Sequence, residues 1–478
     1  MGVESPKEEC GVVGIWAPDE EVAKLLYFGI YALQHRGQEA AGMAVSDGEQ
    51  IIVYKDTGLV SQVFNESSLN ALRGSLGIAH TRYSTTGSST WENAQPSYRP
   101  ILRNDSGIAL GHNGNLTNTL ELAERLREQR LGGVRATTDS DLVCGLLAQH
   151  DGSLQEALLE VVPTLKGAFS MVVMDESQLW AFRDPHGVRP LSIGRLPAGG
   201  WVVASETCAL DIMGAQFVRE VEPGEIVGIG PEGLTSHIYA KPTPKLCIFE
   251  YVYLARPDSI LEGVTVHETR REMGRILAEE SPIEADLVIG VPDTGPVAAA
   301  GYSEASGIPY GDGLVKNRYV GRTFIQPSQT MRQLGIRLKL NPLRNAVKGK
   351  RLVVVDDSIV RGNTTRQLVK LLREAGATEV HLRITSPPVR WPCFYGIDMA
   401  TRKELIASDL SVEEIGAFTG ADSLAYLSLE AMVRATGKAA TGFCRACFDG
   451  IYPIEPPAGG LVDPKMVLEM VPDQPRLV

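Results

Sequence analysis

The chain has 478 residues, of which 44% are hydrophobic and 22% are charged. These proportions are those of a globular protein, and the length is too great for one ordinary domain. The formal net charge of −12 argues against a nucleic-acid binder, because such proteins present a dominant basic face.

We expect neither export nor a membrane span. The start, MGVESPKEEC, lacks the apolar core of a signal peptide, and no apolar run reaches about 18 residues. Seven cysteines in a chain of this length do not resemble a secreted disulfide framework. We therefore predict a cytoplasmic protein.

The first predicted element is a short apolar strand at residues 10–16, CGVVGIW. Taken alone, its leading cysteine is an ordinary core thiol. Residues 31–42, YALQHRGQEAAG, are predicted to be a helix end and a turn. Polar groups then stand at strand edges or helix starts in three phrases: IAHTRYSTTG (78–87), LGHNGNL (110–116) and TTDSDL (137–142). Together with Cys10, these phrases resemble the glutamine amidotransferase domain of the N-terminal nucleophile hydrolases, over roughly residues 10–240.

Releasing ammonia from a carboxamide requires a nucleophile, a proton acceptor and a group that stabilises the oxyanion. A thiol is a good nucleophile only when a base takes its proton. The resemblance implies that Cys10 becomes the first residue after removal of residues 1–9, so that its own α-amine, which titrates near pH 8, is the base. It also implies an oxyanion hole made by the Asn113 side chain and the Gly114 N–H.

The same resemblance implies that Arg82 binds the α-carboxylate of glutamine, to which its guanidinium fork is suited. It also implies that Asp139 binds the α-ammonium of glutamine. Each residue also has an ordinary reading. Asn-Gly is a common hairpin turn, and Asp139 can simply cap a helix. The rest of this half alternates strands and turns (168–175, 179–194 and 201–207), with Cys144 and Cys208 as core thiols and His186 as a structural histidine. Residues 240–246, AKPTPKL, form a plausible junction.

The second half is predicted to consist of βα units around residues 352–365, LVVVDDSIVRGNTT. Four apolar residues, three of them β-branched, are typical of a strand buried on both faces of a parallel sheet. Two carboxylates, Asp356 and Asp357, follow the strand, and a helix is expected from Arg366 to Ala375, ended by Gly376. Such sheets bind ligands beyond the carboxyl ends of their strands, and helix amino termini bind phosphate. The stretch therefore predicts a ribose-phosphate site.

This stretch resembles the diphosphoribose signature of the type I phosphoribosyltransferases. The resemblance implies that 5-phosphoribosyl diphosphate (PRPP) binds to a loop whose members are Asp356, Asp357, Ser358, Ile359, Val360, Arg361, Gly362, Asn363, Thr364 and Thr365. Residues 292–295, PDTG, are similar to the family's pyrophosphate loop. There Thr294 would join Asp356 and Asp357 around a hydrated Mg²⁺.

A basic segment lies between these loops, at residues 313–344. We interpret it as a lid that closes over the diphosphate and excludes water, and we expect residues 324–343 to be mobile without substrate. Its basic residues are Lys316, Arg318, Arg322, Arg332, Arg337, Lys339 and Arg344. Lys316 and Arg318 match positions that the family resemblance links to nucleotide binding.

Four cysteines of this half remain, namely Cys247, Cys393, Cys444 and Cys447. The last two form a C-x₂-C pair, which by spacing alone fits half a zinc site, a redox pair or an iron–sulfur site. The surrounding phrases KLCIFEYVY, WPCFYGID and FCRACF resemble an iron–sulfur branch in which four such cysteines bind a [4Fe–4S] cluster.

As a whole, residues 10 to about 455 resemble the amidophosphoribosyltransferase family. The resemblance implies a propeptide (1–9), an αββα amidotransferase domain (10–243), a parallel-sheet phosphoribosyltransferase domain (244–455) and a flexible tail (456–478). It also implies glutamine and PRPP as substrates, Mg²⁺ and [4Fe–4S] as cofactors, purine nucleotides as inhibitors, and a homotetramer. The alternatives are an amidotransferase with another acceptor, which the DDSIVRGNTT loop disfavours, and a non-catalytic PRPP sensor, which would need no thiol nucleophile.

Overall fold

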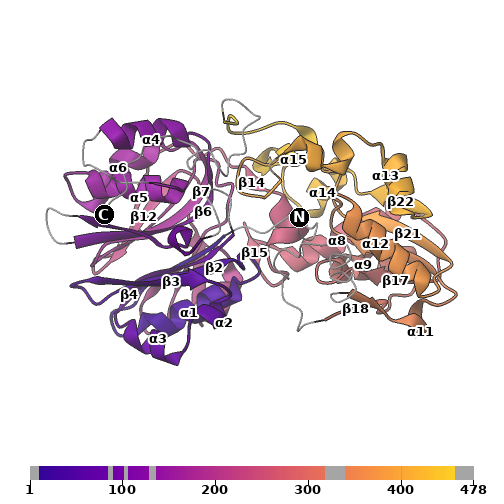
Figure 1. Cartoon of the computed structure of the whole chain (residues 1–478), viewed down its shortest axis with the longest axis horizontal. Coiled ribbons are helices and arrows are strands. Elements are labelled where there is room, and N and C mark those ends of the chain that lie inside the picture. Colours follow the sequence, from indigo (N-terminus) through magenta and orange to yellow (C-terminus); the bar gives the residue numbers. More distant parts are fainter. Residues whose placement is uncertain are drawn as a thin grey trace.

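The computed structural model describes residues 10–83, 90–101, 106–128, 136–317, 340–399 and 401–457. The first half of the chain forms one lobe and the second half forms another beside it, indigo to magenta and orange to yellow in Figure 1. In this described part of the chain, no helix has both the length and the apolar character needed to cross a membrane.

The first lobe contains two antiparallel sheets packed face to face. The seven-stranded sheet has the order β11-β9-β10-β1-β4-β2-β3. Its strands are β1 (Gly11–Trp16), β2 (Ala40–Ser46), β3 (Ile51–Thr57), β4 (Leu76–Arg82), β9 (Ser192–Arg195), β10 (Trp201–Ala204) and β11 (Gln216–Glu220). The six-stranded sheet has the order β13-β12-β8-β7-β6-β5. Its strands are β5 (Ser97–Ile101), β6 (Ser106–Leu116), β7 (Gly167–Met174), β8 (Leu179–Arg183), β12 (Glu225–Gly230) and β13 (Gly233–Ile238).

Helices cover the outer face of each sheet, which gives four layers in the order αββα (Figure 1). On the first sheet lie α1 (Val22–Ala32), α2 (Val60–Val63), α3 (Glu66–Ala71) and α7 (Thr207–Ile212). On the second lie α4 (Thr119–Glu128), α5 (Asp139–Gln149) and α6 (Leu154–Val161), with the short turns η1 (Trp91–Asn93) and η2 (Val162–Thr164) in connections. Cys144 and Cys208 are buried in these layers, as predicted.

The second lobe is built on a parallel sheet of order β17-β20-β21-β22. Its main elements are β17 (Leu287–Gly290), β20 (Arg351–Asp356), β21 (Glu379–Ile384), β22 (Ser423–Tyr426), α8 (Val266–Glu280), α9 (Gly295–Ser306), α12 (Asn363–Glu374), α13 (Val412–Thr419) and α14 (Leu429–Ala435). Val353 and Val355 of β20 pack in the cluster with α8 and α9, whereas Leu352 and Val354 pack against α12. This strand is therefore buried on both faces, as its composition predicts.

Short elements complete this lobe. They are β14 (Leu246–Cys247), η3 (Glu250–Leu254), β15 (Ile260–Leu261), β16 (Val264–Thr265), β18 (Leu314–Lys316), β19 (Leu340–Pro342), α11 (Arg344–Val347), η4 (Arg402–Glu404), η5 (Ile406–Ser408), η6 (Ala440–Gly442), β23 (Phe443–Cys444) and α15 (Ala446–Asp449). Strand β14 pairs in parallel with β23, and β18 pairs with β19.

Two expectations about local structure differ from the result. The helix predicted from Arg366 begins at Asn363 instead, because Gly362, with φ +80°, completes the turn out of the strand. Residues 340–342, predicted as part of a mobile lid, form strand β19 through pairing with β18. Residues 318–339 of that predicted lid lie outside the described residues.

Candidate active sites

Cys10 lies directly before β1, at the centre of the seven-stranded sheet. Its side chain is buried, and its Sγ donates to the carbonyl oxygen of Tyr83 at 3.3 Å and accepts from the Tyr83 N–H at 3.4 Å. Burial raises the pKa of the Cys10 thiol to about 12, against the weaker opposing effects of the Tyr83 hydrogen bond and the Arg82 charge. At neutral pH the thiol is therefore protonated, and it needs a base before it can act as a nucleophile.

Asn113 and Gly114 lie within strand β6, paired with Ser170 and Phe169 of β7, so they do not form a hairpin turn. The Asn113 side chain is completely buried, and neither its Nδ2 nor its Oδ1 has a hydrogen-bond partner among the residues that the structure describes. A buried unpaired amide is costly, and a substrate oxygen would satisfy it. Gly114 has φ +143°, and a Cβ there would stand 2.0 Å from the Ala168 carbonyl oxygen, so only glycine fits.

Asp139 opens α5, but the helix cap is Thr138, whose side chain accepts from the Asp141 N–H. The buried Asp139 carboxylate accepts from the Leu116 N–H at 3.2 Å and the Ser140 N–H at 2.8 Å. Burial raises the pKa of Asp139, but the charge and hydrogen bond of His112 and these two N–H groups outweigh it, so the pKa is lowered. The group is thus held as an anion that can bind an ammonium.

Arg82 is buried at the end of β4. Its charge lowers the pKa of Cys10, and the charge of Asp139 raises it, so the structure brings these three predicted residues together. His112 was not assigned from sequence. Its Nδ1 lies 3.3 Å from Ser140 Oγ and 3.4 Å from the Asp139 carboxylate. The position of His112 directly before Asn113, in the phrase LGHNGNL, is the signal that could have indicated it.

The second predicted site lies where β17 and β20 end together. These strands are parallel, with Gly290 opposite Val355, and the loops that follow them meet: the Thr294 hydroxyl donates to the Asp357 carboxylate. Ser358 Oγ donates to the same carboxylate at 2.5 Å. Burial and then the charge of Asp357 raise the pKa of Asp356 well above its ordinary value. Burial likewise raises the pKa of Asp357, partly opposed by Ser358, Thr294 and the Arg270 charge. A cation or hydroxyl donor placed here would relieve the repulsion.

The remaining residues of the predicted PRPP loop fall into groups with different surroundings. Ile359 and Val360 are buried in apolar clusters, so only their backbones can contact a ligand. Arg361 pairs with Glu404. Gly362 is the residue before α12, and Asn363, Thr364 and Thr365 form its first turn, where helix N–H groups have no partner in the helix.

The basic segment is described only at its two ends. Lys316 lies in β18 and pairs with Asp293, next to Thr294, so it stands beside the second site. Arg344 opens α11, and its Nη1 donates to the Glu374 carbonyl oxygen at 3.4 Å. Arg318, Arg322, Arg332, Arg337 and Lys339 lie outside the described residues.

Three separate segments bring Cys247, Cys393, Cys444 and Cys447 into one core cluster. Cys247 of β14 is the partner of Cys444 of β23. Burial raises the pKa of Cys447 well above its ordinary value, and the charges of the other three cysteines raise it further. Nevertheless, in the described part of the chain no three His, Cys, Asp or Glu side chains are placed to hold a metal ion.

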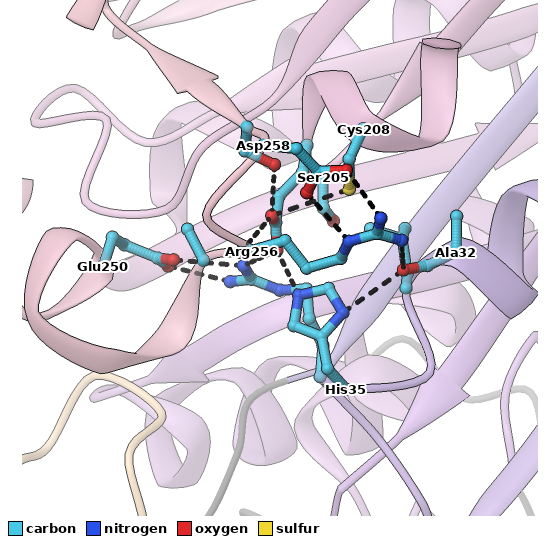
Figure 2. Close-up of polar contacts among 12 residues, drawn as sticks. Ala32, His35, Ser205, Cys208, Glu250, Arg256 and Asp258 are labelled. Atoms are coloured by element: carbon cyan, nitrogen blue, oxygen red, sulfur yellow. Dashed lines mark hydrogen bonds and ion pairs between the residues drawn. The ribbon is translucent and has the colours of Figure 1, made fainter. Parts of the chain in front are cut away.

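A buried polar network joins the two lobes, and the sequence did not indicate it. Arg36, in the turn that follows α1, donates to Glu206 at 2.5 Å and to Glu250 at 2.8 and 3.0 Å. Figure 2 shows Glu250 on the left of this network, His35 below its middle and Ala32 on the right. Arg256 donates to the Ala32 carbonyl oxygen at 3.2 Å. The lobes also meet beside β6, where Asn115 Nδ2 donates to the Phe394 carbonyl oxygen at 3.1 Å.

Comparisons with known proteins agree with this arrangement. Residues 80–211 match the family described as glutamine amidotransferase domain, and residues 266–385 match the phosphoribosyl transferase domain. The chain is 60% identical to a curated amidophosphoribosyltransferase of Mycobacterium leprae, over 99% of this chain and 86% of the relative. It is 48% identical to the amidophosphoribosyltransferase of Bacillus subtilis, over 94% of each.

A solved structure gives the same result for the fold. The glutamine phosphoribosylpyrophosphate amidotransferase of B. subtilis, complexed with ADP and GMP, is 46% identical and aligns with a TM-score of 0.89 over 96% of this chain and 100% of that chain. The predicted fold class, an αββα sandwich followed by a parallel-sheet transferase, is thereby confirmed.

Proposed function

Because the chain belongs to the amidophosphoribosyltransferase family, we propose that it makes 5-phosphoribosylamine, glutamate and pyrophosphate from glutamine, PRPP and water, the first step of purine synthesis. The observation that carries this proposal is the pairing of two sites in one chain. A buried thiol and an unpaired Asn113 carboxamide form one. A carboxylate pair at the carboxyl end of β20 forms the other. A PRPP sensor would need no such thiol.

We assign glutamine hydrolysis to residues 10–243. In this scheme the α-amine of Cys10 takes the thiol proton, and the sulfur attacks the amide carbon of glutamine. Asn113 Nδ2 and the Gly114 N–H hold the oxyanion. Collapse of the tetrahedral adduct breaks the C–N bond and releases ammonia, which leaves with the proton, and water then hydrolyses the thioester to glutamate. Arg82 and Asp139 hold the two charged groups of the substrate.

The base in this scheme exists only if residues 1–9 are removed. An amide nitrogen in the Glu9–Cys10 bond has no basic lone pair, and the buried thiol has a pKa of about 12. We therefore propose that residues 1–9 are a propeptide. Intact mass before and after activation tests this, and full glutamine hydrolysis by a chain that still carries the nine residues would contradict it.

We assign the transfer step to residues 244–455. Ammonia attacks carbon 1 of PRPP and the bond to pyrophosphate breaks. The first turn of α12 would hold the 5-phosphate, and Asp356 and Asp357 would hold the ribose hydroxyls directly or through Mg²⁺. Mg²⁺ bound there would neutralise the diphosphate charge. Among the described residues, two carboxylates and the hydroxyls of Thr294 and Ser358 gather at this point, so most of the Mg²⁺ ligands would be diphosphate oxygens and water, as is usual for this ion.

We further propose that the four cysteines of the second lobe bind a [4Fe–4S] cluster. The four irons of such a cluster each take a different thiolate, so the donors stand farther apart than around one zinc ion, whose bonds to sulfur are about 2.3 Å long. What supports the proposal is that the four cysteines come from separate segments and gather in or against one core cluster, with Cys247 opposite Cys444. Cys393 directly precedes the residues that contact Asn115, so the cluster would anchor the contact between lobes. The test is to measure iron and acid-labile sulfide in anaerobically purified protein. Both present in wild type, with lower contents of both in Cys444→Ser, would support the cluster.

Purine-nucleotide inhibition and a homotetramer complete the proposal. The B. subtilis structure contains ADP and GMP, and Lys316 of this chain lies beside the diphosphate loop, which suits a phosphate-bearing inhibitor. Inhibition by GMP that is lost in Lys316→Ala would support this role. Light scattering tests the tetramer.

The test of the function as a whole is release of glutamate and pyrophosphate from anaerobically purified protein, with each substrate omitted in turn. Equal release that requires both substrates supports the coupled reaction. Cys10→Ala should lose the glutamine-dependent reaction and retain pyrophosphate release with ammonium chloride. If wild type releases neither product after full processing and cluster loading, the proposed function is wrong.

A further inference from the structure

The Asp139 carboxylate of the first site is supported by a side chain that has no chemistry of its own. Gln95 lies between η1 and β5, and its carboxamide connects strand β6 to helix α5. We propose that Gln95 is a positioning residue that aims the Asp139 carboxylate at the α-ammonium of glutamine, so that the site selects ligands that carry an α-amine. This inference rests on the proposed function.

The two ends of the Gln95 carboxamide have separate partners. Its Oε1 accepts from the His112 N–H at 2.8 Å, and its Nε2 donates to Ser140 Oγ at 3.0 Å. A backbone N–H can only donate, so these partners fix the orientation of the carboxamide. All three residues are at most 6% exposed. The bridge is therefore held in one arrangement, and water does not compete for it.

Ser140 passes this constraint to the carboxylate. Because its Oγ accepts from Gln95 Nε2, its single hydrogen is left for another acceptor, and Asp139 Oδ1 lies 3.4 Å away. The Ser140 N–H donates to the same oxygen at 2.8 Å. His112 Nδ1 lies 3.4 Å from the other oxygen, Oδ2. Both oxygens of the carboxylate are thus held by residues that Gln95 contacts.

The backbone around Gln95 is held from the other side, by the first sheet. The Lys55 ammonium, in β3, donates to the carbonyl oxygens of the residues on either side, Ala94 at 2.5 Å and Pro96 at 3.3 Å. A Cβ at Gly42, in β2, would stand 2.2 Å from the Gln95 carbonyl oxygen, so the loop packs directly on this strand. Precise placement of a binding group requires such rigid support.

The aim of the Asp139 carboxylate determines which ligands bind. Glutamate and glutarate differ only in the α-amine, and they share every other contact that the site can make. A buried carboxylate that faces an ammonium gains an ion pair, whereas a ligand without the amine leaves it desolvated and unpaired. Without Gln95 the carboxylate is free to turn away, so the difference in affinity between the two ligands becomes smaller.

A purely structural role is the competing explanation, since the bridge also holds β6 to α5. That role would weaken the binding of every ligand of the site equally, whereas a positioning role weakens only ligands that carry the α-amine. The quantity that separates the two roles is the amine preference. We define it as the KI of glutarate divided by the KI of glutamate, each measured as a competitor of glutamine.

The experiment uses processed, cluster-loaded protein and measures inhibition of glutamine-dependent pyrophosphate release at saturating PRPP. The variants are Gln95→Met, Ser140→Ala and the double variant, with Asp139→Asn as the reference for complete loss. We expect the amine preference to fall by at least about tenfold in each, the lower end of the usual effect of losing a hydrogen bond to a charged group. The KI of glutarate should stay near its wild-type value. The double variant should lose no more than the single ones, because both changes break one chain of hydrogen bonds.

The matched control is Gln34→Met. The Gln34 carboxamide also bridges two segments of the first lobe, since its Oε1 accepts from the Val60 N–H at 2.8 Å and its Nε2 donates to the Gly37 carbonyl oxygen at 2.5 Å. These partners belong to α2 and to the segment after α1, not to β6 or α5, so the amine preference should not change. If Gln95→Met does not fold, Ser140→Ala carries the test, and the same loss is expected.

Four results would overturn the inference. The amine preference could equal that of wild type in both single variants, or the losses in the double variant could multiply. Asp139→Asn could retain the full preference, or Gln34→Met could lose as much as Gln95→Met. Failure of the proposed function is a separate outcome, because wild type would then release neither glutamate nor pyrophosphate.

Discussion

In the proposed mechanism single residues carry the chemistry of the first site, and Asn113 shows how burial would prepare one for this role. Its amide is completely buried and unpaired within the described part of the chain, so its dipole is already oriented and desolvated before substrate arrives. This is the condition under which a donor to an oxyanion has its greatest effect.

Asn113→Ala should therefore lower kcat for glutamine hydrolysis by about 10²–10³-fold, the usual effect of losing one oxyanion donor. KM should change little, because the donor acts mainly on the transition state. Steady-state kinetics of glutamate release measures both constants. Asn118→Ala, a change of the same residue type outside the site, serves as control. A rise in KM with unchanged kcat would show that Asn113 binds the ground state instead.

The carboxylates of the second site are a different case, because their negative charges destabilise the free protein. Burial and the neighbouring Asp357 raise the pKa of Asp356 well above its ordinary value. An acid whose pKa is raised by folding destabilises the fold wherever it is ionised, and the protein gains stability as pH falls through the folded-state pKa. Function thus maintains a charge that stability disfavours.

Asp356→Asn should raise the thermal unfolding midpoint of the free protein in EDTA at pH 7.5 while removing PRPP-dependent pyrophosphate release. The gain should shrink as the pH is lowered, since wild type then becomes neutral there as well. Scanning calorimetry at several pH values measures this, and a midpoint below that of wild type at pH 7.5 would refute the assigned direction.

At the scale of elements, sequence reasoning succeeded where one local phrase determines both the backbone and the chemistry. The strand, the acids and the helix of residues 352–365 are contiguous, so their arrangement follows from the chain direction. Only the helix start differed, because Gly362 completes the turn earlier than the threonines suggested.

Gly362→Ala should weaken this element. The residue has φ +80°, and an added Cβ would stand 2.7 Å from Ile406 Cδ1. We expect a cost of about 1–3 kcal/mol and a higher KM for PRPP, because the first turn of α12 shifts. Gly349→Ala is the matched control, since Gly349 has φ +73° but open space around its Cα. Equal KM values in both variants would show that backbone strain alone, and not the clash beside the loop, determines the effect.

At the scale of the molecule, nothing in the sequence indicated the network between the lobes. Arg36 is 170 positions from Glu206 and 214 positions from Glu250 along the chain. No periodicity or motif links residues so far apart. His35 and Arg36 were in a phrase interpreted as a helix end, and Glu250 stood beside a cysteine of interest. Each had a local explanation, so their pairing became visible only in three dimensions.

This network predicts acid lability. Burial raises the pKa of Glu206, but the charges of His35 and Arg36 outweigh it and hold the pKa well below the ordinary value of 4.5. Its stabilising effect is therefore present above about pH 4.5 and is lost as pH falls below that value. Glu206→Gln should cost about 3–5 kcal/mol at pH 7, as for other broken buried pairs.

Because large proteins often unfold irreversibly, apparent midpoints at one fixed scan rate should be compared between pH 7 and pH 4. Between pH 7 and pH 4 the apparent unfolding midpoint should fall further in wild type than in Glu206→Gln. In the exposed control Glu232→Gln, the midpoint should fall by as much as in wild type. Parallel pH profiles for wild type and Glu206→Gln would show that another group controls acid lability.

The pairing of β14 with β23 also has a consequence for biosynthesis. It places Cys247 against Cys444, so the thiol site of the second lobe is divided between the start and the end of that lobe's sequence. While a ribosome is still translating the intervening residues, Cys444 has not been made and β14 has no strand to join. The second lobe therefore cannot close until the residues of β23 have been translated. Any group that binds to both Cys247 and Cys444 would be inserted after this point and not during translation.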